Sequence, residues 1–124
     1  LQAHELGVLL KTTVFDLIYS SPLKRAKETA EILNGYLQSR IILEASLREA
    51  SYGSAEGMKR EEYRLKYANE LARIHNLPFH KRMTSKVIPD GESTEEVATR
   101  ALCFLKNLVS EGKEKKLLIV CHGG

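Results

Sequence analysis

A histidine and two glycines directly follow an apolar run near the carboxyl end of the sequence. The run, LLIVC at positions 117–121, is typical of a strand buried on both faces of a parallel sheet. His122 would then lie at the carboxyl end of that strand, where open α/β sheets bind their ligands. Gly123 and Gly124 allow the backbone to turn tightly and to approach a bound anion. The alternative is an ordinary glycine-rich turn in which His122 only fills space.

A second segment, far upstream in the sequence, places an arginine at an expected helix N-terminus, where a bound anion would be stabilised. Phe15–Tyr19 is apolar, aromatic and β-branched, which predicts a short strand. Ser21 and Pro22 then predict a helix start, with Ser21 as the N-cap and Pro22 at the first helical position. Arg25 falls in the first turn, where a cation is unfavourable against the helix dipole. Its presence indicates an anion nearby, and a solvated surface arginine is the alternative.

The elements around these residues alternate between helices and strands, which predicts an α/β fold with a largely parallel sheet. Ser93 opens the clearest helix, because Glu96 three residues later completes a capping box, and Gly112 is expected to end that helix. Its expected core stripe is Val97, Ala101, Phe104, Leu105 and Leu108. The other expected elements are helices at 1–10, 23–37 and 59–74, a strand at 41–43, and loops at 52–57 and 76–89.

Four sequence blocks, in this order, resemble the histidine phosphatase (phosphoglycerate mutase-like) superfamily, and the resemblance covers nearly the whole chain. The pattern S-x-L-x-R-A-x-x-T-A is present at 21–30, and LREASYGSAEG at 47–57 is similar to L-x-E-x-x-x-G-x-x-E-G. PDGES at 89–93 is similar to P-x-G-E-S, and the strand ending in His122 and Gly123 is the fourth block. The resemblance implies a three-layer sandwich, a parallel sheet flanked by helices, of which residues 1–124 form an incomplete domain.

The resemblance also implies phosphoryl transfer through a covalent phosphohistidine. In this scheme His122 is the second histidine of the site, a donor to the phosphoryl oxygens, and Arg25 clamps the phosphate with its planar fork of donors. Gly123 lies beside the phosphate. Glu49 matches the proton donor, for which an ordinary exposed loop glutamate is the alternative. Tyr52 occupies a substrate-binding position of the mutase branch.

The family's R-H-G motif, which carries the nucleophilic histidine, is not found around any of the four histidines. We therefore expect residues 1–124 to be a truncated domain, without the first strand and the carboxyl-terminal elements, and to be inactive alone. Glu92 is expected to anchor its loop rather than to act chemically. His4, His75 and His80 have no motif around them.

The stretch between Glu49 and His122 is shorter than in glycolytic mutases. In this compact length the sequence resembles the phosphatase branch of the family. The expected activity is hydrolysis of a small phosphorylated metabolite, with a phosphoglycerate mutase or a non-catalytic phospho-ligand binding module as alternatives. An α/β-hydrolase is a poor alternative because the G-x-S-x-G elbow is absent, and the Walker pattern is absent too.

The composition of the sequence limits the classes of partner that the protein is expected to bind. With 124 residues and a net charge of +3, the chain is one domain or part of one and does not predict a nucleic-acid surface. Cys103 and Cys121 lie in apolar segments and are expected to be buried, reduced thiols of a cytoplasmic protein. No membrane span, signal peptide, metal site or cofactor is expected. The oligomeric state is left open.

Overall fold

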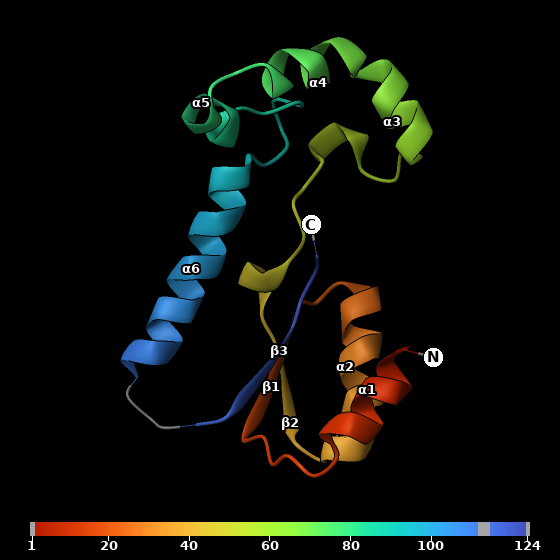
Figure 1. Ribbon diagram of the computed structural model, residues 1–124, viewed down its shortest axis with the longest axis vertical. Coiled ribbons are helices and arrows are strands. Elements are labelled where there is room, and N and C mark those ends of the chain that lie inside the picture. The colour runs from red at the N-terminus through yellow and green to blue at the C-terminus, as the bar shows by residue number, and fades with distance from the viewer. Residues whose placement is uncertain (1, 112–114, 124) are drawn as a thin grey trace. The chain divides into compact units, whose positions relative to one another are not determined.

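The computed structural model describes residues 2–111 and 115–123 (Figure 1). The chain divides into two compact units, and we describe each by itself. The first unit is Leu1–Glu49 with Cys103–Gly124, and the second is Ala50–Leu102.

The first unit is built on a parallel sheet of three strands in the described part of the chain. The strands are β1 (Leu17–Ser20), β2 (Arg40–Leu43) and β3 (Leu117–Val120), in the order β2-β1-β3. The expected strand at Phe15–Tyr19 is therefore displaced towards the carboxyl end. Asp16 lies outside the strand, where its side chain accepts a hydrogen bond from the backbone N–H of Lys116 at 2.8 Å.

One face of this sheet is covered by helix α2 (Lys24–Leu37). Because side chains alternate along a strand, Ile18 and its register partners Ile41 and Leu118 share this face. The buried core there comprises Ile18, Ala26, Ala30, Leu33 and Val120. Helix α1 (Gln2–Leu10) packs on α2 so closely that a Cβ on Gly7 would overlap the ring of Tyr36.

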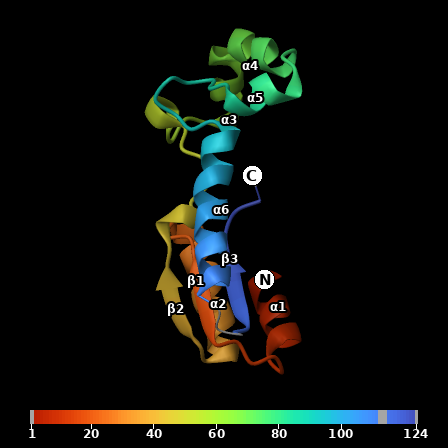
Figure 2. The same cartoon turned by 90° about the vertical axis from the view of Figure 1, so that its left-hand side faces the viewer.

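The opposite face carries Tyr19, whose ring meets that of Phe104 edge-on with centroids 5.2 Å apart. Phe104 belongs to the carboxyl-terminal half of helix α6 (Thr94–Ser110). The sheet thus lies between α2 and this half of α6 (Figure 2), which confirms the three-layer α/β sandwich. No residue of α6 is fully buried, and Leu105 of the expected stripe is exposed. The expected end of the helix at Gly112 lies outside the described residues.

The second unit contains helices α3 (Arg60–Lys66), α4 (Ala68–His75) and α5 (Phe79–Thr84). The single helix expected at 59–74 was wrong, because the backbone of Tyr67 leaves the helical region at φ −107° and ψ 21°. The expected loop at 76–89 was also wrong in part. Pro78 directly precedes α5, a position that suits its fixed φ.

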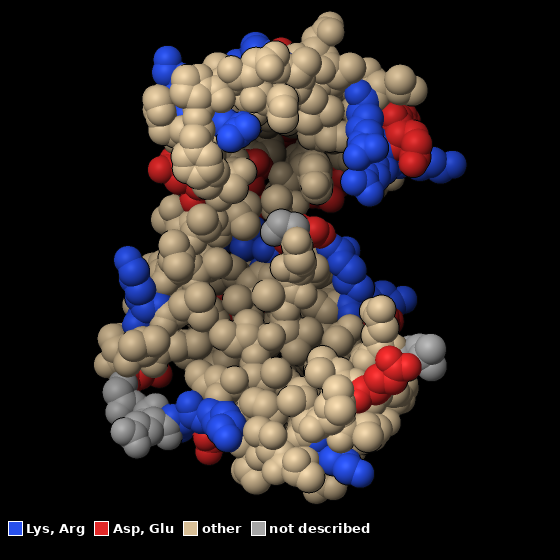
Figure 3. All heavy atoms as spheres, in the orientation of Figure 1, with Lys and Arg blue, Asp and Glu red and all other residues tan. Residues whose placement is uncertain are grey.

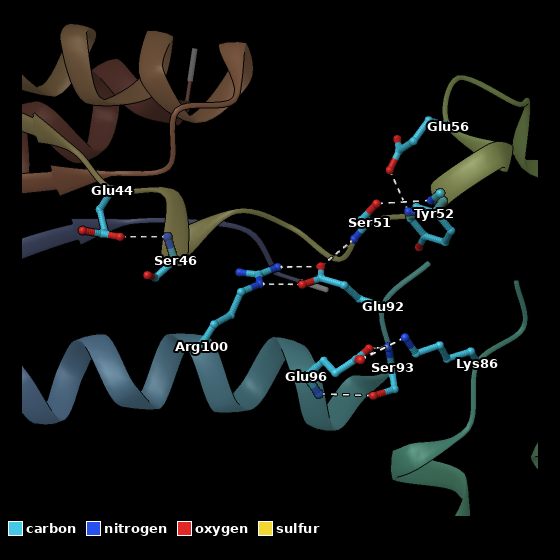
Figure 4. Close-up of polar contacts among 11 residues, drawn as sticks. Glu44, Ser46, Ser51, Tyr52, Glu56, Lys86, Glu92, Ser93, Glu96 and Arg100 are labelled. Atoms are coloured by element: carbon cyan, nitrogen blue, oxygen red, sulfur yellow. Dashed lines mark hydrogen bonds and ion pairs between the residues drawn. The ribbon is translucent and has the colours of Figure 1, made fainter. Parts of the chain in front are cut away.

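The amino-terminal end of α6 has the predicted capping box. The Ser93 hydroxyl accepts from the backbone N–H of Glu96 at 3.2 Å, and the Glu96 carboxylate accepts from the N–H of Ser93 at 2.8 Å (Figure 4). Lys86 forms an ion pair with the same carboxylate, so the loop before α6 is fixed to the start of the helix.

Cys103 and Cys121 are free and exposed, so the expectation of buried thiols was wrong. An apolar sequence neighbourhood did not bury them, because Cys103 is on the solvent side of α6 and Cys121 follows the end of β3. No helix among the described residues is long and apolar enough to cross a membrane. On the face drawn in Figure 3, basic and acidic side chains occur in separate small groups, and neither forms a continuous surface.

Candidate active site

The carboxyl ends of β1 and β3 bring Ser21 and His122 together. The parallel pairing places Ser20 opposite Val120, and the backbone N–H of Ser21 donates to the Val120 carbonyl at 2.9 Å. Beyond that bond, Nε2 of His122 lies 2.8 Å from Oγ of Ser21. A contact between residues 101 positions apart is therefore fixed by the sheet register.

Ser21 is not the N-cap of α2, and this expectation was wrong. The helix begins at Lys24, and Leu23 occupies the cap position without a side-chain hydrogen bond. The Ser21 hydroxyl instead accepts from the backbone N–H of Leu23 at 3.3 Å and contacts His122. The serine is thus part of the site and is fully buried.

Arg25, in the first turn of α2, pairs with the carboxylate of Glu49. Glu49 reaches this point because the chain turns after β2. The backbone N–H of Glu44 donates to the Ser20 carbonyl, and the Glu44 carboxylate accepts from the N–H of Ser46 at 2.8 Å (Figure 4). A short 3-10 helix at Ala45–Leu47 then leads towards Glu49. The Arg25 side chain is 63% exposed and that of Glu49 is 30% exposed.

Burial lowers the pKa of His122 below its ordinary value of 6.5, and the positive charge of Arg25 lowers it further. The imidazole is therefore neutral at neutral pH. Arg25 thus acts on both of the other predicted residues of the first unit, because it pairs with Glu49 and its charge lowers the pKa of His122. Their catalytic roles stay predictions.

Gly123 follows His122 and is exposed. A Cβ at this position would meet no described atom within 4 Å, so the surroundings do not themselves require a glycine. Among the described residues, no group of three or more His, Cys, Asp or Glu side chains is arranged to hold a metal ion.

Tyr52 lies in the second unit, where its ring meets that of Tyr63 edge-on with centroids 5.4 Å apart. Its backbone N–H donates to the Glu56 carboxylate at 2.6 Å (Figure 4). The residue is 45% exposed, and its substrate-binding role stays a prediction. The next residue, Gly53, has φ +51°, and a Cβ there would lie 2.5 Å from Asp90.

Glu92 anchors its loop, as expected. Its carboxylate accepts two hydrogen bonds from Arg100, at 2.8 and 2.9 Å, and one from the backbone N–H of Ser51 at 2.8 Å (Figure 4). The backbone N–H of Glu92 donates back to the Ser51 carbonyl at 2.9 Å. The segment that carries Tyr52 is therefore tied to the start of α6.

The sequence contained a signal for Ser21 that the capping interpretation hid. In a parallel sheet, residues that directly follow two paired strands lie at the same edge. Ser21 follows β1, and His122 comes two residues after the end of the paired strand β3. The register of β1 against β3, and not the helix-capping preference of serine, therefore indicates that Ser21 lies beside His122.

Comparison with known proteins decides the family. Residues 1–124 match the family model of the histidine phosphatase superfamily, branch 1. The chain belongs to this superfamily. It is 38% identical over 122 residues to the "Uncharacterized phosphatase PhoE" of Bacillus subtilis, with 98% of the chain and 55% of that protein covered. It is also 30% identical to a 2,3-bisphosphoglycerate-dependent phosphoglycerate mutase of Cytophaga hutchinsonii, covering 98% of the chain and 57% of the mutase.

A solved structure gives the same result for the fold. Bacillus stearothermophilus YhfR superposes with a TM-score of 0.82 at 30% identity, over 98% of this chain and 57% of that one. The chain thus spans little more than half the length of these relatives. The resemblance inferred from the four sequence blocks is confirmed at the level of family and fold.

Proposed function

We propose that the protein containing this chain is a phosphomonoester hydrolase that acts through a phosphohistidine intermediate on a small phosphorylated metabolite. The proposal is supported by the Arg25–Glu49 ion pair, by the contact of His122 with Ser21 just after β3 and β1, and by the effect of the Arg25 charge on His122. A cation and an imidazole N–H can each donate to the oxygens of a transferring phosphoryl group, and a carboxyl group can protonate the leaving oxygen.

Arg25 and His122 would stabilise the transferring phosphoryl group. Negative charge spreads over its equatorial oxygens in the transition state, and fixed donors around them lower the barrier. The guanidinium of Arg25 offers a planar fork that matches two such oxygens. Without substrate, burial and the charge of Arg25 hold the pKa of His122 below 6.5, so the ring is neutral and one of its nitrogens carries an N–H that can donate.

Glu49 would protonate the leaving oxygen. In this structure its carboxylate forms an ion pair with Arg25, the same group that is proposed to bind the phosphoryl oxygens. A bound phosphoryl group competes for the guanidinium and brings negative charge next to Glu49, and both effects favour the protonated form of the carboxyl group. Substrate binding itself would thus prepare the acid.

The attacking histidine would come from outside residues 1–124, since none of the four histidines stands in an R-H-G motif. The reacting protein is then a longer polypeptide in which that motif precedes this chain. The two free cysteines fit a reducing compartment, and we propose the cytoplasm as the place of action.

The proposal is tested by trapping the intermediate on the longer protein. Brief incubation with a ³²P-labelled phosphomonoester should leave acid-labile, base-stable label on the protein, as expected for a phosphoramidate. Arg25→Gln should greatly reduce labelling. Lys24→Gln, which removes the neighbouring and more exposed cation, should leave it unchanged. Absence of both label and phosphate release with the unmodified protein would contradict the proposal.

Phosphoglycerate mutase activity is the second candidate, because relatives with that name are 30% identical to the chain. The same preparation should be supplied with 3-phosphoglycerate and the isomers resolved. We expect phosphate release to exceed isomerisation, and dominant isomerisation would favour the mutase.

A further inference from the structure

The Ser21 hydroxyl is a buried group with few partners. The residue has no exposed surface. Among the described residues, its Oγ has two hydrogen-bond contacts, with the backbone N–H of Leu23 at 3.3 Å and with Nε2 of His122 at 2.8 Å. Both contacts lie in the first unit, beside the proposed phosphoryl site.

The donor in the hydrogen bond between Ser21 Oγ and His122 Nε2 can be assigned by counting the donors and acceptors around Oγ. The Leu23 N–H can only donate, so it occupies one lone pair of Oγ. The hydroxyl hydrogen also needs an acceptor, because buried polar groups are almost always hydrogen-bonded. Within the described part of the chain, Nε2 of His122 is the acceptor in reach. If Nε2 carried the proton, the buried hydroxyl hydrogen would have no acceptor there.

The opposite ring nitrogen is thereby defined as well. In a neutral imidazole one nitrogen carries the hydrogen and the other accepts, so an accepting Nε2 leaves the hydrogen on Nδ1. Nδ1 makes no hydrogen bond to another described residue. Burial and the charge of Arg25 both lower the pKa of His122 and so favour the neutral ring that this arrangement needs. The other charge at the site, Glu49, is itself paired with Arg25.

We propose that Ser21 is a positioning residue that holds His122 in the tautomer with the hydrogen on Nδ1 and directs that N–H to a phosphoryl oxygen. The tautomer follows from the hydrogen bonds alone, and the phosphoryl contact rests on the proposed function. Ser21 does not touch the substrate in this proposal. It acts through His122, as the buried partner of a catalytic histidine holds tautomer and orientation in other enzymes.

Nitrogen NMR of the longer protein, labelled with ¹⁵N-histidine, tests the tautomer directly at a pH above the His122 pKa. In the unmodified protein, Nδ1 should resonate as a protonated nitrogen and Nε2 as an unprotonated one. In Ser21→Ala both signals should move towards the average of the two tautomers. Ser20→Ala is the matched control, because Ser20 is equally buried but its hydroxyl donates to the backbone carbonyl of Ser21.

Kinetics on the same variants test the consequence. Ser21→Ala should lower kcat by about 10–100-fold, a loss like that on removing the outer partner of a metal-bound histidine. It should change KM little because Arg25 still binds the phosphate. Ser21→Thr keeps the hydroxyl and should restore most of kcat, and Ser20→Ala should not change it.

The possible failures are distinguishable. A proton on Nε2 in the unmodified protein, or an unchanged tautomer in Ser21→Ala, would overturn the inference whatever the activity. A shifted tautomer with unchanged kcat would overturn the link to catalysis. Absence of phosphatase activity in the unmodified protein would count against the proposed function, while the NMR result would still decide the role of Ser21.

Discussion

The carboxylate of Glu49 lies against the guanidinium of Arg25, although the two residues are 24 positions apart in the sequence. The ion pair connects the segment after β2 with the first turn of α2. Because both partners are partly exposed, the pair contributes little to folding stability. Its importance lies in the proposed chemistry, where the clamp and the acid are neighbours before substrate arrives.

Replacing the proposed acid should separate substrates by their leaving groups. Glu49→Gln keeps the shape of the side chain but removes the proton, so an alkoxide would have to leave unprotonated. Hydrolysis of alkyl phosphates by the longer protein should fall by about 10²–10⁴-fold. Hydrolysis of p-nitrophenyl phosphate should fall much less, because the nitrophenolate is a stable anion.

Steady-state kinetics on both substrate types measure this difference. Arg48→Gln is the matched control, since it changes the adjacent exposed residue without touching the carboxyl group. Equal losses for alkyl and aryl substrates would remove Glu49 from the role of acid.

Removal of the imidazole should act on both substrate types alike. His122→Ala removes a donor to the phosphoryl group itself, and loss of one such donor typically costs about 10²–10³-fold in kcat. The same kinetic series measures the effect, with His75→Ala as the control in the second unit. A loss confined to alkyl phosphates would show that His122 serves the leaving group instead.

The pKa of His122 should respond to Arg25. Burial and the Arg25 charge both hold it below 6.5, so Arg25→Gln should raise it part of the way back. Histidine NMR signals followed against pH measure the shift, and Arg48→Gln should leave it unchanged. A pKa that does not rise in Arg25→Gln would mean that the guanidinium does not act on the imidazole in solution.

The same shift makes stability depend on pH in a defined direction. Below 6.5 the unfolded chain binds a proton at His122 before the folded protein does. Acidification from pH 6.5 down to the His122 pKa of the folded protein therefore lowers the free energy of unfolding. Above pH 6.5 His122 is neutral in both states, and the free energy of unfolding is not reduced in this way. His122→Gln should reduce that loss, as measured by urea denaturation at a series of pH values. An unchanged pH dependence would contradict the assignment.

The capping box of α6 should contribute measurably to stability. Ser93→Ala removes the hydroxyl that accepts from the N–H of Glu96 and should cost about 1 kcal/mol. Thr94→Ala, an exposed hydroxyl at the next position, should cost much less. Chemical denaturation of the two variants compares them, and equal effects would mean that the cap does not hold the helix end.

Residues 1–124 expressed alone should not hydrolyse phosphomonoesters, because no histidine among them stands in an R-H-G motif. In the described part of the chain, β2 and β3 are the outer strands of the sheet, and their outer edges should also make this polypeptide prone to aggregation. Size-exclusion chromatography and a phosphatase assay measure both properties. Turnover by a soluble, cooperatively folding monomer would overturn this expectation.

Local sequence patterns predicted the features that depend on local chemistry. The Ser93–Glu96 capping box follows from two residues one helical turn apart, and this prediction was correct. The parallel sheet followed from the alternation of elements. Arg25, Glu49 and His122 were placed through family blocks, which carry information about tertiary structure that periodicity does not.

Features that depend on contacts between distant segments were not predicted. Ser21 has the residue type of an N-cap, but its hydroxyl contacts a histidine 101 positions away. Cys121 stands in an apolar run, but the run extends past the end of the strand. Pro78 lies in the expected loop at 76–89, but the structure has helix α5 directly after it.

The pairing of β1 with β3 has a consequence for the order of events during synthesis. Ser21 and His122 are 101 residues apart, and ribosomes add about 5–20 residues per second, so roughly 5–20 s separate their emergence. During this interval β1 and α2 can associate, but Ile18 has no Val120 to complete its core. The Ser21 hydroxyl likewise has no contact with His122 until the end of this interval. The nascent chain therefore passes through a stage in which apolar surface is already exposed while the site does not yet exist, the stage at which chaperones are most useful.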